Sequence, residues 1–245
     1  MAGIKVTPTF SSGHLVTTLL TLLLVMFVLI DLITIALGYS RVVYLSHMLT
    51  GEEVLSHTDL TADNDGQQLA RTALIATYLI TGVVFLIWLY RARRNVLAVS
   101  SRGQRYSSPW AIGLFFVPFL NLYYSYDIVT DLWKQSNPDV GLSDAFLWQH
   151  ASTLGQYSSK TALIGVCWGL VIASAVVARI SSTMGSHATD ISDLINESYA
   201  VMISDALRTV AIIILIVLVN RIDARLEEKH RRHNLDAAMQ QVARS

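Results

Sequence analysis

The chain has one cysteine and no excess of either charge, and these two features exclude some kinds of site and partner. Cys167 is the only cysteine among 245 residues, so neither an internal disulfide nor a site built from several thiolates can form. Lysine and arginine together number 18, as do aspartate and glutamate, so the formal net charge is zero. A neutral chain has no overall attraction for the phosphates of nucleic acid, and we expect no nucleic-acid partner.

Catalytic motifs are missing as well. The sequence contains no phosphate-binding loop, no nucleophile elbow and no HExxH pair. None of the seven histidines takes the spacing of paired metal ligands within an apolar segment, and His230 with His233 forms only a weak pair in a charged stretch. We therefore predict a protein without enzymatic activity, cofactor or metal.

What the chain has in abundance is apolar sequence. Hydrophobic residues make up 53% and charged residues 15%, with a mean hydropathy of +0.47, which is too apolar for an ordinary soluble domain. The apolar residues gather in four segments near the roughly 20 residues that a helix needs to cross hydrocarbon. These segments are 15–37, 72–90, 161–180 and 199–220. The pattern predicts an all-α, polytopic membrane protein with its membrane domain at 15–220.

Charges between the predicted spans are sorted by sign, and this predicts the orientation. The loop after the second span has no acid before Asp127 and carries a group of arginines: Arg91, Arg93, Arg94, Arg102 and Arg105. The loop after the first span has more acids than bases, and 181–197 has acids only. Because basic loops stay in the cytoplasm, we predict that 1–14 and 221–245 are both cytoplasmic, in a cell membrane.

A shorter segment, 110–133, is apolar only in its first half and contains Pro118. The chain is predicted to be inside at Arg105 and inside again before 161–180, so 110–133 cannot cross. It is typical of a re-entrant hairpin or of a helix in the inner interface. Five spans with an external C-terminus are the alternative, but they place the basic tail on the wrong side of the membrane.

The segment 221–245 is predicted to continue the fourth span as a charged helix. Glu227 with Arg231, and Glu228 with Arg232, have the favourable spacing of four residues. Ile222, Leu226, Met239 and Val242 add a ragged apolar stripe. This helix is either a solvated extension or a contact for a protein partner or for anionic lipid.

One block resembles a known family. It runs from an aromatic span end through an Arg-x-x-Asn turn, a Ser-Pro-x-Trp-Ala segment and a Pro-x-x-Asn-Leu turn to a Leu-Trp pair. Its residues are Trp88, Arg91, Arg94, Asn95, Ser108, Pro109, Trp110, Ala111, Pro118, Asn121, Leu122, Asp127, Leu132 and Trp133. The block is similar to the bacterial membrane family called domain of unknown function 4328, which implies a membrane fold and no established activity. The chain departs from the family at Tyr124 and Ser125, where a basic residue and a proline are expected.

The same block has a physical interpretation. Asn95 is expected to cap the end of the second span after the arginines have reached lipid phosphates. Pro109 is suited to the first turn of a helix, and Pro118 with Asn121 to a break where the chain turns back. These roles are structural and require no ligand.

Three ionisable groups are expected inside the membrane, away from the ends of their spans: Asp31 in the first span, Asp205 and Arg208 in the fourth. Asp31 and Arg208 lie at similar distances from the external ends of their spans, which favours an ion pair, with Asp205 on the same helix face as Arg208. The cluster is either a docking contact between helices or part of a proton or ion pathway. A fourth span that begins nearer Ala206 would instead leave Asp205 and Arg208 in the external interface.

The third span contains small residues at intervals of four, Gly165, Gly169 and Ala173. Such a row lets another helix approach closely, and we predict packing within the bundle, with dimerisation as the alternative.

Two classes of function follow from these features. The first is a non-enzymatic module that organises or regulates a partner in the membrane, which is another protein or a second copy of the chain. The second is a small transporter or channel component that uses Asp31, Asp205 and Arg208, since interrupted helices build substrate sites in transporters.

Overall fold

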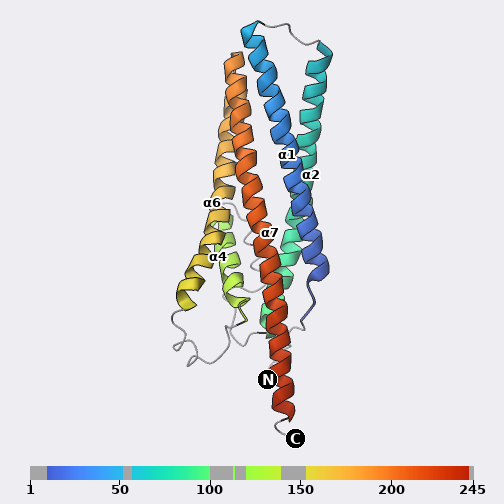
Figure 1. The fold of residues 1–245 in the computed structure, drawn as a ribbon, viewed down its shortest axis with the longest axis vertical. Coiled ribbons are helices and arrows are strands. Elements are labelled where there is room, and N and C mark those ends of the chain that lie inside the picture. Colours follow the sequence, from blue (N-terminus) through green and yellow to red (C-terminus); the bar gives the residue numbers. More distant parts are fainter. Residues whose placement is uncertain (1–9, 52–56, 100–112, 114–119, 139–152, 243–245) are drawn as a thin grey trace. The chain divides into compact units, whose positions relative to one another are not determined.

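Long α-helices form the regular structure of the part of the chain that is described. A computed structural model describes residues 10–51, 57–99, 113, 120–138 and 153–242. The helices are α1 (His14–Thr50), α2 (His57–Val99), α4 (Leu120–Gln135), α6 (Thr153–Ser186) and α7 (Ile191–Val242), as Figure 1 shows. The predicted all-α fold is confirmed.

Four of these helices are long and apolar enough to cross a membrane. The qualifying stretches are His14–Thr50, Gln68–Val99, Ala162–Ser186 and Ile191–Leu235. Each covers one predicted span, apart from the first residue of 161–180. Large apolar side chains are exposed along them, among them Leu22, Ile75, Leu79, Val166 and Ile213. Such surfaces are favourable against lipid and costly against water. The protein is a multi-pass membrane protein.

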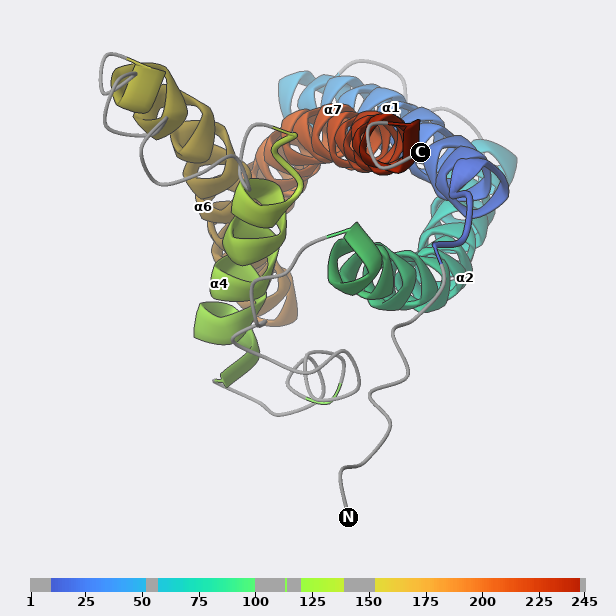
Figure 2. The same cartoon turned by 90° about the horizontal axis from the view of Figure 1, so that it is seen from below.

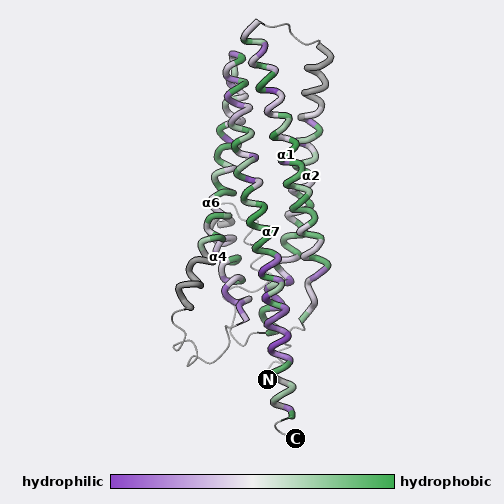
Figure 3. The backbone as a smooth tube through the Cα atoms, in the orientation of Figure 1, coloured by the Kyte–Doolittle hydropathy of each residue, from purple (hydrophilic) through white to green (hydrophobic). Residues whose placement is uncertain are grey.

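The helices continue well past the predicted spans. The 37 residues of α1 correspond to about 55 Å of helix, whereas hydrocarbon is about 30 Å thick. The longest helix, α7, runs for 52 residues from Ile191 to Val242, and Figure 3 shows it changing from hydrophobic to hydrophilic towards its end. The predicted charged tail is thus continuous with the fourth span.

Local sequence accounts for two of the helix ends. Gly51 has φ of 74°, a left-handed conformation that glycine adopts without strain, and it follows the last residue of α1. At the start of α7, the Asp193 carboxylate accepts hydrogen bonds from the backbone N–H groups of Thr189 and Asp190, at 3.1 and 3.3 Å. Asp193 therefore satisfies donors that the first turn of a helix leaves free.

The chain divides into two compact units. Unit 1 comprises Met1–Thr21, Val83–Gly165 and Ile216–Ser245, and unit 2 comprises Leu22–Gly82 and Val166–Leu215. Unit 1 has a core of large buried side chains that includes Trp88, Leu89, Ile128, Trp133, Leu218 and Ile222. The buried side chains of unit 2 include Leu24, Phe27, Cys167, Ala211 and Ile212.

The middle segment forms a short helix in its second half. α4, seen as a separate short helix in Figure 2, has 16 residues and is not among the four stretches that qualify as spans. Pro109, Trp110 and Pro118 lie outside the described residues. The choice between a re-entrant and an interfacial segment for 110–133 therefore stays a prediction.

Candidate functional sites

Asp31, Asp205 and Arg208 meet in unit 2. The Arg208 guanidinium donates from Nη2 to Asp31 Oδ1 at 2.7 Å and from Nε to Asp31 Oδ2 at 3.1 Å. The same Nη2 lies 2.6 Å from Asp205 Oδ1, one turn away on α7. Two nitrogens of one guanidinium thus bind Asp31 on α1, a geometry that suits arginine and not lysine.

Neighbouring side chains complete this ion cluster. Thr34 Oγ1 lies 2.9 Å from Asp205 Oδ2, and Thr209 Oγ1 lies 3.4 Å from Asp31 Oδ2. The ring of Phe27 faces the guanidinium carbon of Arg208, 5.7 Å from its centroid. The hydroxyls and the ring add favourable contacts for the charged groups, which apolar surroundings alone would disfavour.

Burial differs among the three charged residues. Asp31 is fully enclosed, with 0% of its side chain exposed, whereas Arg208 keeps 28% exposed. Loss of the ion pair with Arg208 would leave Asp31 as an unpaired buried charge, which is strongly unfavourable. The ion cluster therefore connects α1 to α7 and is suited to stabilising the packing of these two helices.

Two cavities in unit 2 adjoin the ion cluster. One has a volume of about 130 Å³ and the other about 430 Å³. They share five lining residues: Arg41, Arg71, Val201, Asp205 and Arg208. Ser181, Ser182, Ser204 and Glu197 line the larger cavity. A small polar solute would meet the Arg208 and Asp205 side chains there.

A second ion pair lies beside the cavities. Arg41 Nη2 on α1 is 3.7 Å from Glu197 Oε2 on α7. The Glu197 carboxylate lies against Gly185, where a Cβ atom would approach it to 2.9 Å. Because Gly185 has no side chain, there is space beside it for the Glu197 carboxylate.

In unit 1, two arginines of the cluster after the second span, Arg91 and Arg93, bind backbone carbonyl groups. Arg91 donates from Nη1 to the Gly13 carbonyl at 3.1 Å and from Nη2 to the Ser11 carbonyl at 2.8 Å. Asn95 pairs with the backbone of Ser11 in both directions, at 2.9 and 3.1 Å. The expected cap at Asn95 is wrong, because α2 continues to Val99 and the amide of Asn95 holds the segment before α1 instead.

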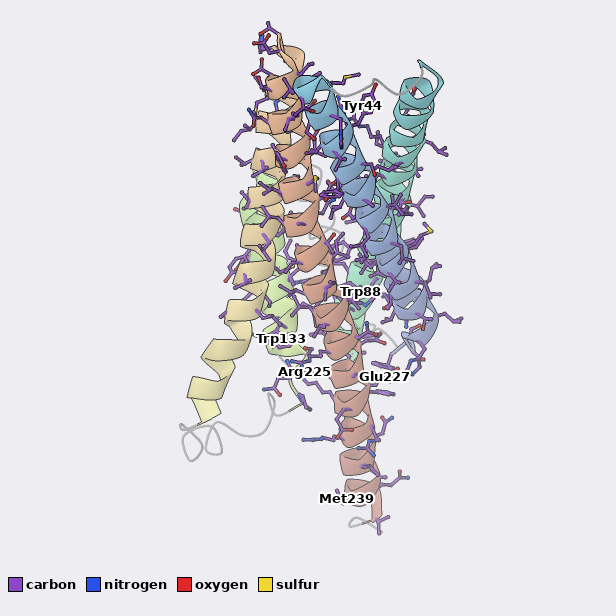
Figure 4. All side chains as sticks on the ribbon, turned by 45° about the horizontal axis from the view of Figure 1, so that its top comes forward. Tyr44, Trp88, Trp133, Arg225, Glu227 and Met239 are labelled. Carbon is purple, nitrogen blue, oxygen red and sulfur yellow. The ribbon has the colours of Figure 1, made fainter. Side chains whose placement is uncertain are left out.

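The helix α4 is fastened to α2 and α7 within unit 1. Arg93 on α2, 1% exposed, donates to Asp131 Oδ2 at 3.3 Å and to the Ile128 carbonyl at 3.4 Å. The guanidinium of Arg225 on α7 lies over the Trp133 ring, 3.9 Å from its centroid, and Figure 4 shows the two side chains together. Lys229 Nζ donates to the Gln135 carbonyl at 2.9 Å.

The remaining residues of the family block divide between core and surface. Trp88 and Trp133 are buried, whereas Arg94 is exposed and lies 5.8 Å from the Tyr90 ring. Asp127 is half-buried on α4. A family model described as domain of unknown function (DUF4328) matches residues 52–224.

The chain belongs to this family. Searches of the curated proteins and of the solved structures found no match. The DUF4328 match includes Asp205 and Arg208 but begins only at residue 52, so that Asp31, Ser11 and Gly13 lie outside it. Arg91 and Asn95 of the family block thus bind Ser11 and Gly13, which the family model does not match.

The predicted row of small residues does not make the expected contact. Open space surrounds a Cβ atom added at Gly165 or Gly169, as far as the described residues show, and Ala173 is only half-buried. α6 packs through another stripe, Ile164, Cys167 and Ser174, which are buried. Cys167 Sγ lies 3.4 Å from the Ala211 carbonyl, and Ser204 donates to the Ser174 carbonyl at 2.9 Å. Among the described residues the glycine row thus makes no close contact, and its packing within the bundle stays a prediction.

The sequence does not predict several contributors to these sites, among them Thr34, Arg93, Arg225 and Lys229. Arg93 was part of the basic loop that set the orientation, but its burial against α4 has no signature in the sequence. Thr34 lies one helical turn after Asp31, and that spacing was the one signal that could have identified it.

Proposed function

We propose that this membrane protein is a non-enzymatic module that organises or regulates a protein partner through the end of α7. In this proposal it resides in a cell membrane with both termini in the cytoplasm. The observation that carries the proposal is an exposed apolar stripe on the charged part of α7: Leu235, Met239 and Val242. Their exposed fractions are between 56% and 76%.

The spacing of this stripe suits a helix partner. Leu235, Met239 and Val242 are separated by four and three residues, so they share one face of α7. Figure 4 shows Met239 near the end of this helix. Glu228 forms ion pairs with Arg231 and Arg232 at 2.6 and 2.7 Å, which supports the helix before the stripe begins.

Helix length favours a protein over lipid as the partner. The apolar part of α7 ends at Val219, and Leu235 follows 16 positions later in the same helix, about 24 Å farther along its axis. The headgroup layer extends only about 5–8 Å beyond the hydrocarbon on each side. Even a tilt of about 40° would leave Leu235 roughly 18 Å away from the hydrocarbon.

Site-specific photocrosslinking in intact membranes tests this proposal. A photoreactive residue in place of Met239 should give a discrete protein adduct, and Leu235→Ser should remove that adduct. Gln241 is the matched control, because it is exposed on the opposite side of the same helical turn. Equal adducts at both positions, adducts with lipid only, or an adduct of two copies of this chain would each contradict the proposal.

Transport is the second candidate function, and one observation favours it. Asp205 and Arg208 contribute to the ion cluster and also line both cavities of unit 2. A solute in these cavities could exchange contacts with the cluster, as intramembrane charges do in transporters. The test is ion or proton flux into liposomes that contain the purified protein. Flux that Asp31→Asn abolishes without loss of folded protein would favour transport over the partner-binding role.

A further inference from the structure

A group of three metal-ligating side chains lies in unit 1, away from the ion cluster. His14, Asp223 and Glu227 each offer one ligand atom, and these atoms all lie within 4.8 Å of one another. His14 Nε2 is 2.9 Å from Glu227 Oε1. Figure 4 labels Glu227 on α7.

Local structure places each of the three side chains. His14 is the first residue of α1, and Asp223 and Glu227 are four residues apart on α7, so both carboxylates lie on one helix face. The position before His14 has no room for a side chain, because a Cβ atom on Gly13 would collide with the Asp223 carboxylate. Arg91 holds the Gly13 carbonyl at 3.1 Å, which fixes the chain beside His14.

Asp223 indicates that the group is more than a surface ion pair. It is 8% exposed, and its carboxylate makes no hydrogen bond or ion pair with any residue that the structure describes. The contact between His14 and Glu227 alone would give this mostly enclosed carboxylate no cationic partner, which is unfavourable. A cation held between the three side chains would compensate it.

We propose that His14, Asp223 and Glu227 bind one divalent transition-metal ion of the Zn²⁺ class. One imidazole nitrogen with two carboxylate oxygens suits Zn²⁺, Mn²⁺ or Co²⁺, whereas Mg²⁺ and Ca²⁺ prefer oxygen ligands throughout. Adjacent ligands of such an ion lie about 3.0–3.4 Å apart, close to the separation of His14 and Glu227. The exposed side of His14 leaves room for water to complete the coordination.

The sequence predicts no metal at these positions. Asp223 and Glu227 look like two acids of a charged helix, and His14 is far from them along the chain. No short motif joins the three residues, so only the contact between the start of α1 and α7 reveals the site.

Zinc titration of the tag-free protein in nanodiscs, followed by calorimetry, tests the proposal. We expect about one equivalent of tight binding for the wild-type protein, and His14→Gln, Asp223→Asn and Glu227→Gln should each weaken it at least about tenfold. Co²⁺ should give a visible absorption band that the same variants lose.

Two controls separate this site from adventitious binding at the surface. His233→Gln removes an exposed imidazole and Glu228→Gln a nearby carboxylate, and both should leave zinc affinity within about twofold of the wild type. Because His14 is exposed, His14→Gln is expected to fold even if Asp223→Asn does not. Unchanged affinity in His14→Gln, or an equal loss in His233→Gln, would overturn the proposal.

Discussion

Arg208 in unit 2 and Arg93 in unit 1 both bind carboxylates, but the rest of their contacts are with different kinds of partner. Arg208 binds the side chains of Asp31 and Asp205, at 2.7 and 2.6 Å. The Arg93 guanidinium donates both to the Asp131 side chain, at 3.3 Å, and to the backbone carbonyl of Ile128, at 3.4 Å. A network between charged side chains is selective for those residues, whereas a carbonyl acceptor is present on every residue.

The contrast extends to the neighbours of each arginine. In unit 1, Arg91, Asn95 and Lys229 also bind backbone groups, at 2.8 to 3.1 Å. In unit 2, Thr34 and Thr209 approach the carboxylates of the ion cluster. Unit 2 is therefore expected to be more sensitive to the loss of a single charge, and unit 1 to depend on several weaker contacts.

The largest expected effect is on the ion cluster. Asp31→Asn should lower the free energy of unfolding by roughly 3 kcal/mol, because Arg208 loses its enclosed partner. The double variant Asp31→Asn with Arg208→Gln should lose less than the sum of the two single losses, since the two side chains pair with each other. Full recovery is not expected, because Arg208→Gln also leaves Asp205 without its cation. Unfolding in detergent measures the cycle, and strictly additive losses would disprove the coupling.

A smaller effect is expected at Arg93. Arg93→Met should cost about 2 kcal/mol, because Asp131 loses its cation while the aliphatic part of the side chain is retained. Arg94→Met is the matched control on the next, exposed position and should change stability by less than about 0.5 kcal/mol. Equal losses in the two variants would remove the distinction between the buried and the exposed arginine.

The smallest effect is expected at Asn95. Asn95→Ala removes two hydrogen bonds to Ser11, but Ser11 is exposed and water can replace them, so the cost should be about 1 kcal/mol. Hydrogen exchange should accelerate at the Ser11 amide and not at the Thr17 amide, which donates to the Gly13 carbonyl. No change at Ser11 would show that Asn95 does not hold this segment in solution.

Side-chain chemistry explains which parts of the sites were predictable. Charged residues are rare within apolar segments, so the positions of Asp31 and Arg208 along their spans were enough to predict that they form an ion pair. The carbonyl partners of Arg91 and Arg93 could not be found in this way, because backbone groups leave no mark in the sequence. Likewise, the glycines at 165 and 169 matched a packing motif, but which face of α6 meets a neighbour depends on the surrounding helices.

The fold was more predictable than the sites. Four apolar stretches sufficed for four long helices, because a backbone in lipid must satisfy its hydrogen bonds internally. Hydropathy could not predict how far the helices extend, because it identifies apolar sequence and not helix propensity. Residues such as Leu226 and Glu228 have a high helix propensity in water, so the helix continues beyond the apolar stretch.

Membrane topology decides whether the end of α7 can meet a cytoplasmic partner, and impermeant thiol labelling in whole cells measures it most directly. Cys167 is buried and would be replaced by alanine as the background. Single cysteines at Ser46 and Ser186, which are exposed, should be labelled from outside, and those at Ser101, Ser143 and Ser245 should not. External labelling at Ser143 would establish a fifth crossing, and labelling at Ser245 without labelling at Ser46 would invert the topology and contradict the proposed cytoplasmic partner.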